Sequence, residues 1–186
     1  MYRELDEQEL ARYCCMRDRM AEDELYRRYA AKVNTLCCRY TDNEEDAEDL
    51  MQEAFIRALN NISTYSYSGK GSLYAWISRI AINLAIDKVR KKRFRVIPLE
   101  IGAHDTIPEP TEEEVERVPQ EKLLEWISRL PDMRRTVFNL YCIDGYSHKD
   151  IAGLLGISEK GSAGVLAKAR KQLKEAIRRY QKEQEQ

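Results

Sequence analysis

The chain has 186 residues and a formal net charge of −1 at pH 7, with 43% apolar residues, 34% charged residues and only eight glycines. This composition is typical of a soluble, helix-rich chain with one or two small domains, and the balanced total charge gives no sign of nucleic-acid binding. The apolar runs are a few residues long and the chain begins with an acidic segment, MYRELDEQEL. We therefore expect no membrane insertion, no signal peptide and a cytoplasmic location.

The charge is distributed in blocks along the chain. The net charge is −6 over residues 1–60, +7 over residues 61–98, −6 over residues 99–130 and +4 over residues 131–186. Two basic segments separated by an acidic connector suit two separate contacts with a polyanion, in which each segment neutralises phosphate groups. A solvated charged face explains any one of these blocks, but it explains their alternation less well.

Apolar periodicity predicts helices in the first 95 residues. One helix is indicated by four apolar side chains at helical spacing, Leu25, Tyr29, Val33 and Leu36. After the turn-like segment 41–43, a second helix includes residues 50–59. A third, strongly apolar helix begins near Ser72 and runs to about Arg93.

The five cysteines are Cys14, Cys15, Cys37, Cys38 and Cys142. Their number is odd, their spacing is not that of a metal site, and no histidine lies near the two Cys-Cys pairs in the sequence. Since they fall inside apolar helical patterns, we expect reduced thiols in the core and neither a metal site nor a cofactor.

A linker is predicted between two helical domains. Four of the five prolines fall between residues 98 and 119, around the acidic run of residues 112–114 and with little apolar periodicity. The predicted fold is all-α, with helical domains at residues 1–95 and 119–182. A flexible, acidic, proline-containing linker at residues 96–118 would join them.

Residues 145–170 predict a helix-turn-helix in the second domain. Ser147 and Asp150 form a capping-box pattern at the start of one short amphipathic helix, and Gly156 ends that helix. Ser158 is a good N-cap for a second helix, whose apolar stripe is Val165, Leu166, Ala169 and Leu173. Such a helix could enter the major groove of DNA, although helix–glycine–helix hairpins also occur in all-α proteins purely for packing.

Two separated segments resemble the group IV, extracytoplasmic-function-type sigma factors of bacterial RNA polymerase. DAEDLMQEAFIRAL (residues 46–59) and WISRIAINLAIDKVRKKR (residues 76–93) are similar to sigma region two, and residues 130–158 are similar to region four. The order, the spacing and the acidic linker also agree with the family. The resemblance implies a non-catalytic initiation factor whose partners are core RNA polymerase, promoter DNA and an anti-sigma factor.

The resemblance implies that the second predicted helix, whose segment at residues 46–59 begins with acidic residues, docks on the largest subunit of core RNA polymerase. Polar contacts would come from Asp46, Asp49, Gln52 and Glu53. Apolar anchoring would come from Leu50 and Phe55. Without the resemblance, a solvated acidic helix start that suits the helix dipole explains the same residues.

The third helix would hold the −10 element of the promoter. Asn83 matches the family position that helps to hold the flipped base. An amide suits this role, because it can hydrogen-bond the edge of an unpaired base. Trp76 offers an aromatic surface near the single strand, with a place in the core as the alternative. Asp87 would orient a neighbouring base or helix end. Backbone phosphates would be bound by six basic side chains, Arg79, Lys88, Arg90, Lys91, Lys92 and Arg93.

In this family the second helix of the helix-turn-helix binds the −35 element, and here the sequence departs from the family pattern. Residues 161–165 read Gly-Ser-Ala-Gly-Val, where polar or basic side chains are usual. We expect a weaker or differently read −35 element, with Ala163 and Gly164 allowing close backbone approach and readout of DNA shape. The other candidate residues are polar or basic, Ser158, Lys160, Ser162, Lys168, Arg170 and Lys171.

Other functions fit the sequence less well. A stand-alone helix-turn-helix regulator would not need the acidic helix together with Asn83, and a helical adaptor would have no DNA role. An enzyme is least supported, because His104 and His148 stand alone and there is no glycine-rich phosphate loop.

Overall fold

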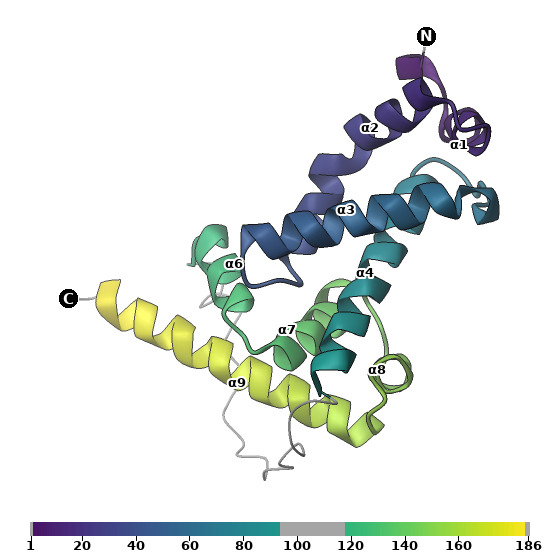
Figure 1. Cartoon of the computed structure of the whole chain (residues 1–186). Coiled ribbons are helices and arrows are strands. Elements are labelled where there is room, and N and C mark those ends of the chain that lie inside the picture. Colours follow the sequence, from purple (N-terminus) through teal and green to yellow (C-terminus); the bar gives the residue numbers. More distant parts are fainter. Residues whose placement is uncertain (1, 94–117, 185–186) are drawn as a thin grey trace. The chain divides into compact units, whose positions relative to one another are not determined.

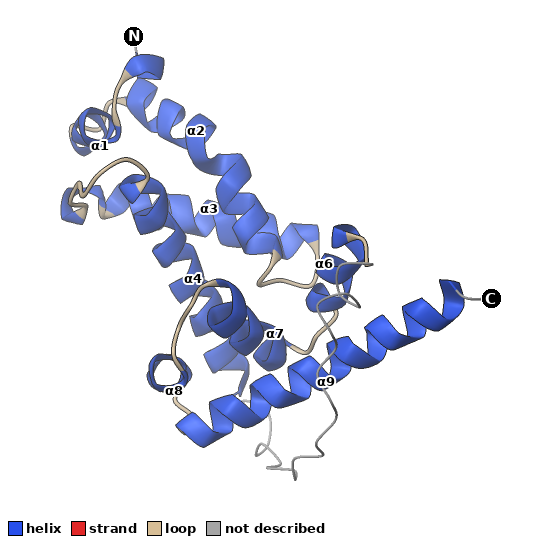
Figure 2. Cartoon of the chain, turned by 180° about the vertical axis from the view of Figure 1, so that it is seen from behind, coloured by secondary structure: helices blue, strands red, loops and turns tan. Residues whose placement is uncertain are grey.

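The computed structural model describes residues 2–93 and 118–184, and within these ranges every regular element is helical (Figure 1; Figure 2). The all-α prediction is confirmed. Contacts divide the chain into two compact units, Met1–Ala85 and Ile86–Gln186, so the division falls within a helix rather than at residue 95. The predicted linker at residues 96–118 lies outside the described residues, apart from Val118. Among the helices that are described, none has the length and hydropathy needed to cross a membrane.

The first unit is built from helices in chain order. They are η1 (Tyr2–Glu4), α1 (Glu7–Cys15), α2 (Arg19–Cys38), α3 (Glu44–Asn60), η2 (Ile62–Thr64) and α4 (Ser72–Arg93), which continues past the boundary. The three predicted helices are confirmed as α2, α3 and α4. Helix α1 was not predicted, although Asp6 followed three residues later by Glu9 is a capping-box pattern in the sequence. In the structure the Asp6 side chain accepts a hydrogen bond from Glu9 N at 2.7 Å.

Aliphatic side chains from all four α-helices form the core of the first unit. Fully buried examples are Leu10, Leu25, Val33, Leu50, Leu73 and Ile77. At the edge of this core, the rings of Tyr26 and Phe55 pack α2 against α3 with centroids 4.8 Å apart. The apolar faces of these helices are therefore buried mainly against one another within the first unit.

A carboxylate from α1 caps the start of α4. The Glu7 oxygens accept hydrogen bonds from Gly71 N at 3.0 and 3.1 Å, from Leu73 N at 3.1 Å and from Tyr29 Oη at 2.9 Å. The first N–H groups of a helix have no partner inside the helix, and the helix dipole favours an anion there. Gly71 has a φ of +90°, which glycine adopts without strain. Glu7 and the turn at Gly71 thus define the start of α4 together.

A second polar cluster ties the N-terminal turn to α2. Glu24 is 6% exposed, and its carboxylate accepts from Arg27 Nε at 2.8 Å and from an Arg28 guanidinium nitrogen at 3.2 Å. Arg28 also donates to the carbonyl oxygen of Leu5 at 2.9 Å. The hydrogen bond from Arg27 is the largest of the effects that lower the pKa of Glu24.

The second unit contains the helix-turn-helix. Its described elements after α4 are α6 (Gln120–Ser128), α7 (Asp132–Phe138), the π-helical turn η3 (Asn139–Ile143), α8 (His148–Leu155) and α9 (Glu159–Gln184). Ser147 and Asp150 form the predicted capping box, and Gly156 ends α8 with a φ of +63°. Ile151, Leu155 and Val165 are buried in the core of this unit, which confirms the predicted pair of helices.

The cysteines are only partly in the core. Cys14 and Cys37 are buried, and burial raises the pKa of the Cys14 thiol to about 12. Cys15, Cys38 and Cys142 are exposed, so the prediction of five core thiols is wrong for these three. Adjacent residues of a helix point about 100° apart, so a Cys-Cys pair cannot place both side chains in the same core.

Replacing Glu7 by Ala should expose the start of α4 to fraying. The substitution removes the acceptor of four donors, which are two backbone N–H groups and the hydroxyls of Tyr29 and Ser72. Hydrogen bonds to a charged group contribute about 1.5–3 kcal/mol to stability. We expect faster amide hydrogen exchange at Leu73–Trp76 and a loss of stability of that size in the first unit. Gln8→Ala, an exposed neighbour on α1, is the control and should leave exchange unchanged. Equal protection in both variants would contradict the capping role.

Glu24 should make the first unit sensitive to acid. Because the pKa of Glu24 is lowered in the folded state, its contribution is complete above the ordinary glutamate pKa of about 4.3. That contribution is lost as the pH falls through the lowered pKa. Glu24→Gln should therefore lower the urea midpoint of α2 at pH 7, measured by hydrogen exchange, and the difference from the wild type should shrink toward pH 3. Asp23→Asn removes the same charge at an exposed neighbour and should show no such convergence.

Candidate nucleic-acid interface

One side of α4 carries a row of polar and aromatic side chains. Trp76, Arg79, Asn83 and Arg90 follow at spacings of three, four and seven residues, which places them on one face of the helix. Arg79, Asn83 and Arg90 are exposed, and Trp76 is half-buried. Asp87 lies on the same side and pairs with Arg90 at 3.0 Å. Five of the residues expected at the −10 element therefore share one side of α4.

Trp76 lies at the margin of the core. Its ring is 5.7 Å from that of Tyr65, with the planes tilted by 57°, and the Tyr65 hydroxyl is 2.6 Å from Ser72 Oγ. The neighbouring Tyr67 is 42% exposed. This arrangement keeps one part of the indole packed and leaves another part accessible, so the tryptophan is neither a free stacking platform nor a fully buried core residue.

The basic end of α4 lies in the second unit. Arg90, Lys91 and Lys92 are exposed, and Lys92 Nζ pairs with Asp132 Oδ2 at 2.7 Å. Lys88 is half-buried. The backbone of Arg93 ends the helix, and its side chain lies outside the described residues. Exposed cations of this kind suit phosphate contacts.

Helix α3 presents an acidic face. Asp49 and Gln52 are exposed and Glu53 is half-buried, at positions that share one side of the helix. Glu53 pairs with Arg57 at 2.7 Å. Asp46 is exposed but takes part in the N-cap, because Asn43 accepts from its backbone N–H at 2.8 Å and donates to its carboxylate at 2.9 Å.

Leu50 and Phe55 do not fit the expected role of apolar anchors. Leu50 is 0% exposed and Phe55 is 4% exposed, because both point into the core of the first unit. They shape the helix and offer almost no surface to a partner. Ile56 is 60% exposed and lies beside Gln52 and Glu53 on the outer face. Apolar periodicity predicts this helix, but it does not show which of several adjacent apolar residues faces outward.

The start of α9 presents few long side chains. Ser158 Oγ accepts from Gly161 N at 2.9 Å and so caps the helix. Lys160 and Arg170 are exposed, and Ala163 and Gly164 are partly exposed, as are Lys168 and Lys171. Ser162, expected to contact phosphate, is 0% exposed, and its hydroxyl is 2.9 Å from His148 Nδ1. That expectation is wrong for Ser162, because its side chain faces α8.

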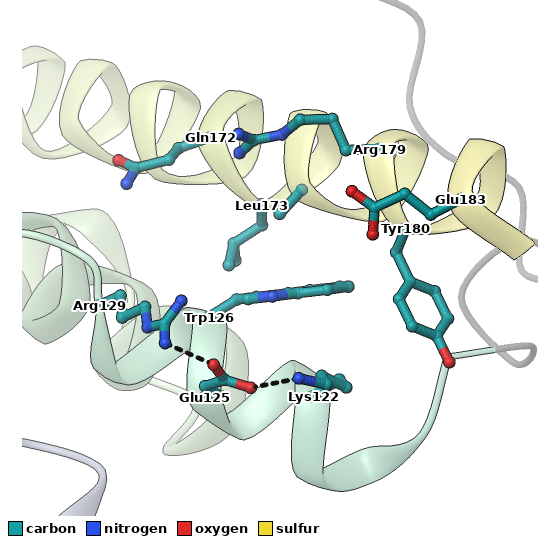
Figure 3. A pocket seen from close by; sticks show the side chains of 10 residues that line it. Lys122, Glu125, Trp126, Arg129, Gln172, Leu173, Arg179, Tyr180 and Glu183 are labelled. Carbon is teal, nitrogen blue, oxygen red and sulfur yellow. Dashed lines mark hydrogen bonds and ion pairs between the residues drawn. The ribbon is translucent and has the colours of Figure 1, made fainter.

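A pocket of about 290 Å³ lies between α6 and α9 (Figure 3). Trp126 and Tyr180 form its aromatic wall, with ring centroids 5.8 Å apart. The Glu125 carboxylate is held by Lys122 at 2.9 Å and by Arg129 at 2.6 Å, and the hydrogen bond from Lys122 is the largest effect lowering its pKa. A carboxylate held ionised in this way is poorly suited to proton transfer.

Both parts of the chain match known families. Residues 25–95 match Sigma-70 region 2, and residues 120–173 match Sigma-70, region 4. Helix α3 and the α4 face fall in the first match, whereas α8 and the first half of α9 fall in the second.

Individual relatives agree with these matches. The chain is 32% identical over 160 residues to the ECF RNA polymerase sigma factor SigM of Bacillus subtilis, covering 83% of this chain and 94% of the relative. It is 30% identical over 168 residues to the ECF RNA polymerase sigma factor SigE of Mycolicibacterium smegmatis, covering 87% of this chain and 63% of the relative. A solved structure of the sigma factor RpoE with the anti-sigma factor NepR, from Bartonella quintana, gives a TM-score of 0.49 at 16% identity, covering 82% of this chain and 94% of the solved chain. The matches to both sigma regions, together with the identity to SigM of Bacillus subtilis, show that the chain belongs to the extracytoplasmic-function (ECF) family of RNA polymerase sigma factors.

Proposed function

We propose that this sigma factor binds core RNA polymerase through the outer face of α3, holds the opened −10 element on α4 and contacts the −35 element with α9. The observation that carries the proposal is the exposure of Asn83 in one row with Trp76 and Arg79. An amide, an aromatic edge and a cation on one surface suit a single strand with an unstacked base. Nucleotidyl transfer belongs to the polymerase. As the family resemblance implies, an anti-sigma factor is the further partner.

The acidic face of α3 supports the contact with polymerase. Asp49, Gln52 and Glu53 combine charge with hydrogen-bonding capacity, and Ile56 adds an exposed apolar side chain beside them. An interface commonly combines an apolar centre with a polar rim. In this arrangement Ile56 takes the anchoring role that the family resemblance assigns to Leu50 and Phe55.

Charge reversal on α3 should weaken binding to core polymerase by a factor of ten or more. Asp49→Lys with Glu53→Lys places like charges against a basic partner, which costs affinity through repulsion. We expect at least a tenfold weaker pull-down or sedimentation affinity, equivalent to about 1.4 kcal/mol, with an unchanged circular dichroism spectrum.

Asp23→Lys is the matched control for this reversal. Asp23 is also exposed and carries the same charge, but it lies on α2 rather than on α3. It should leave polymerase affinity close to that of the wild type. Full affinity in the double variant would show that α3 docks by another face.

Asn83→Ala should reduce promoter opening much more than polymerase binding. The proposed hydrogen bond forms only after the base has left the stack, so its loss acts on the open complex. We expect permanganate reactivity of the −10 region to fall several-fold at a cognate promoter while core affinity stays the same. An open-complex yield equal to that of the wild type would remove Asn83 from the −10 surface.

A further inference from the structure

A polar contact joins the two helices of the helix-turn-helix. His148 is the first residue of α8, and its Nδ1 shares a hydrogen bond of 2.9 Å with Oγ of Ser162, which is 0% exposed on α9. The imidazole also stacks on the ring of Tyr141 from η3, with centroids 4.4 Å apart and planes 20° apart. The histidine is therefore held on a face of its ring by Tyr141 and at the Nδ1 edge by a buried hydroxyl.

The ring of Tyr141 also contacts a side chain of α9 directly. The guanidinium carbon of Arg170 is 6.0 Å from the centroid of Tyr141, at a distance typical of a cation–π contact. An Arg170 nitrogen is 3.9 Å from the Cys142 sulfur. Tyr141 thus links His148 to Arg170, the exposed cation proposed to meet DNA, and η3 contacts both helices of the motif.

The composition of α9 makes its orientation unusually important. Gly161, Ala163 and Gly164 leave this part of the helix without long side chains, and a Cβ added at Gly164 would meet no atom within 4 Å. Long, flexible side chains can correct a small error in helix placement, but a helix that approaches DNA with its backbone cannot. Readout of shape or of thymine methyl groups then depends on the rotation and depth of α9 itself.

A hydrogen bond can specify that rotation where apolar packing specifies it less well. Hydrogen bonds have a preferred direction, whereas the hydrophobic effect is non-directional. Ser162 lies one turn after the cap at Ser158, and its N–H donates to the Ser158 carbonyl at 2.9 Å, so the local helix is already regular there. The Ser162 side chain is not needed for the helix cap, so its hydrogen bond to His148 can fix the rotation of α9 about its axis relative to α8.

We propose that His148 is a positioning residue, which sets the orientation of α9 on the −35 element through its hydrogen bond to Ser162. This inference rests on the proposed role of α9 at the −35 element. It assigns Ser162 an indirect part in promoter choice in place of a phosphate contact. Loss of the hydrogen bond then changes which −35 sequences are preferred more than it changes the fold.

The test selects promoters from a library with a randomised −35 segment and a fixed −10 element, using reconstituted holoenzyme. Ser162→Ala and His148→Phe each remove the hydrogen bond, and the phenyl ring can still stack on Tyr141. Each should lower the enrichment of preferred over scrambled −35 sequences roughly fivefold, which corresponds to the net worth of one hydrogen bond. His148→Asn retains a polar atom near the Nδ1 position and should keep most of the enrichment.

Two further variants separate positioning from stability. The double variant His148→Phe with Ser162→Ala should lose no more enrichment than either single variant, because the residues act through each other. Gly153→Ala on α8, where an added Cβ meets nothing within 4 Å, should leave the enrichment unchanged. Uniformly weaker binding to all promoters, with an unchanged enrichment ratio, would overturn the inference, since that is what a merely stabilising contact would produce.

A separate arm distinguishes this inference from the proposed role of α9. Ala163→Lys should change the preferred −35 sequence if α9 lies in the groove. A shift with Ala163→Lys but none with Ser162→Ala or His148→Phe would overturn the positioning role alone. A wild-type holoenzyme that enriches no −35 sequence would overturn the role of α9, and the positioning role with it.

Discussion

The Glu7 carboxylate at the start of α4 is the contact on which the proposed −10 surface depends. It accepts from the N–H groups of Gly71 and Leu73, 64 and 66 residues away in the chain, and from the Tyr29 hydroxyl. This contact fixes the first turn of α4 to α1 and α2. Trp76, Arg79 and Asn83 follow within three turns, so their placement over the unit derives from that first turn. A helix that began elsewhere, or frayed at its start, would carry the same residues without presenting them in a fixed place.

Polar side chains near helix starts recur in both units. Asp6, Asn43 and Ser147 accept backbone N–H groups at the N-cap of α1, α3 and α8, and Ser158 caps α9. These bonds satisfy donors that the helix itself leaves unpaired. At Asp46 the cap also bears on function, because the capping interaction with Asn43 engages part of a side chain that the family resemblance assigns to the polymerase contact.

Burial separates residues that a motif match treats alike. Leu50 and Phe55 lie inside the helix that matches sigma region two, yet the core takes both, and Ile56 is the apolar side chain left outside. Ser162 lies inside the match to region four, but its hydroxyl turns to His148. The family resemblance implies which helix meets a partner, whereas packing against neighbouring helices decides which faces of that helix are available.

By itself, the sequence determined the helical class, α2, α3 and α4, the helix-turn-helix and the family, because periodicity, caps and motifs are local properties. Asn83, Arg79 and Asp49 could be proposed from the motif and its spacing, and the exposure of each is consistent with the proposal. Only the tertiary structure decided that Glu7 caps α4, that Ser162 pairs with His148 and that Leu50 is buried. These are contacts between residues distant in the chain, or between the faces of two different helices. The pattern of residues along the sequence does not show which distant residue a side chain will contact.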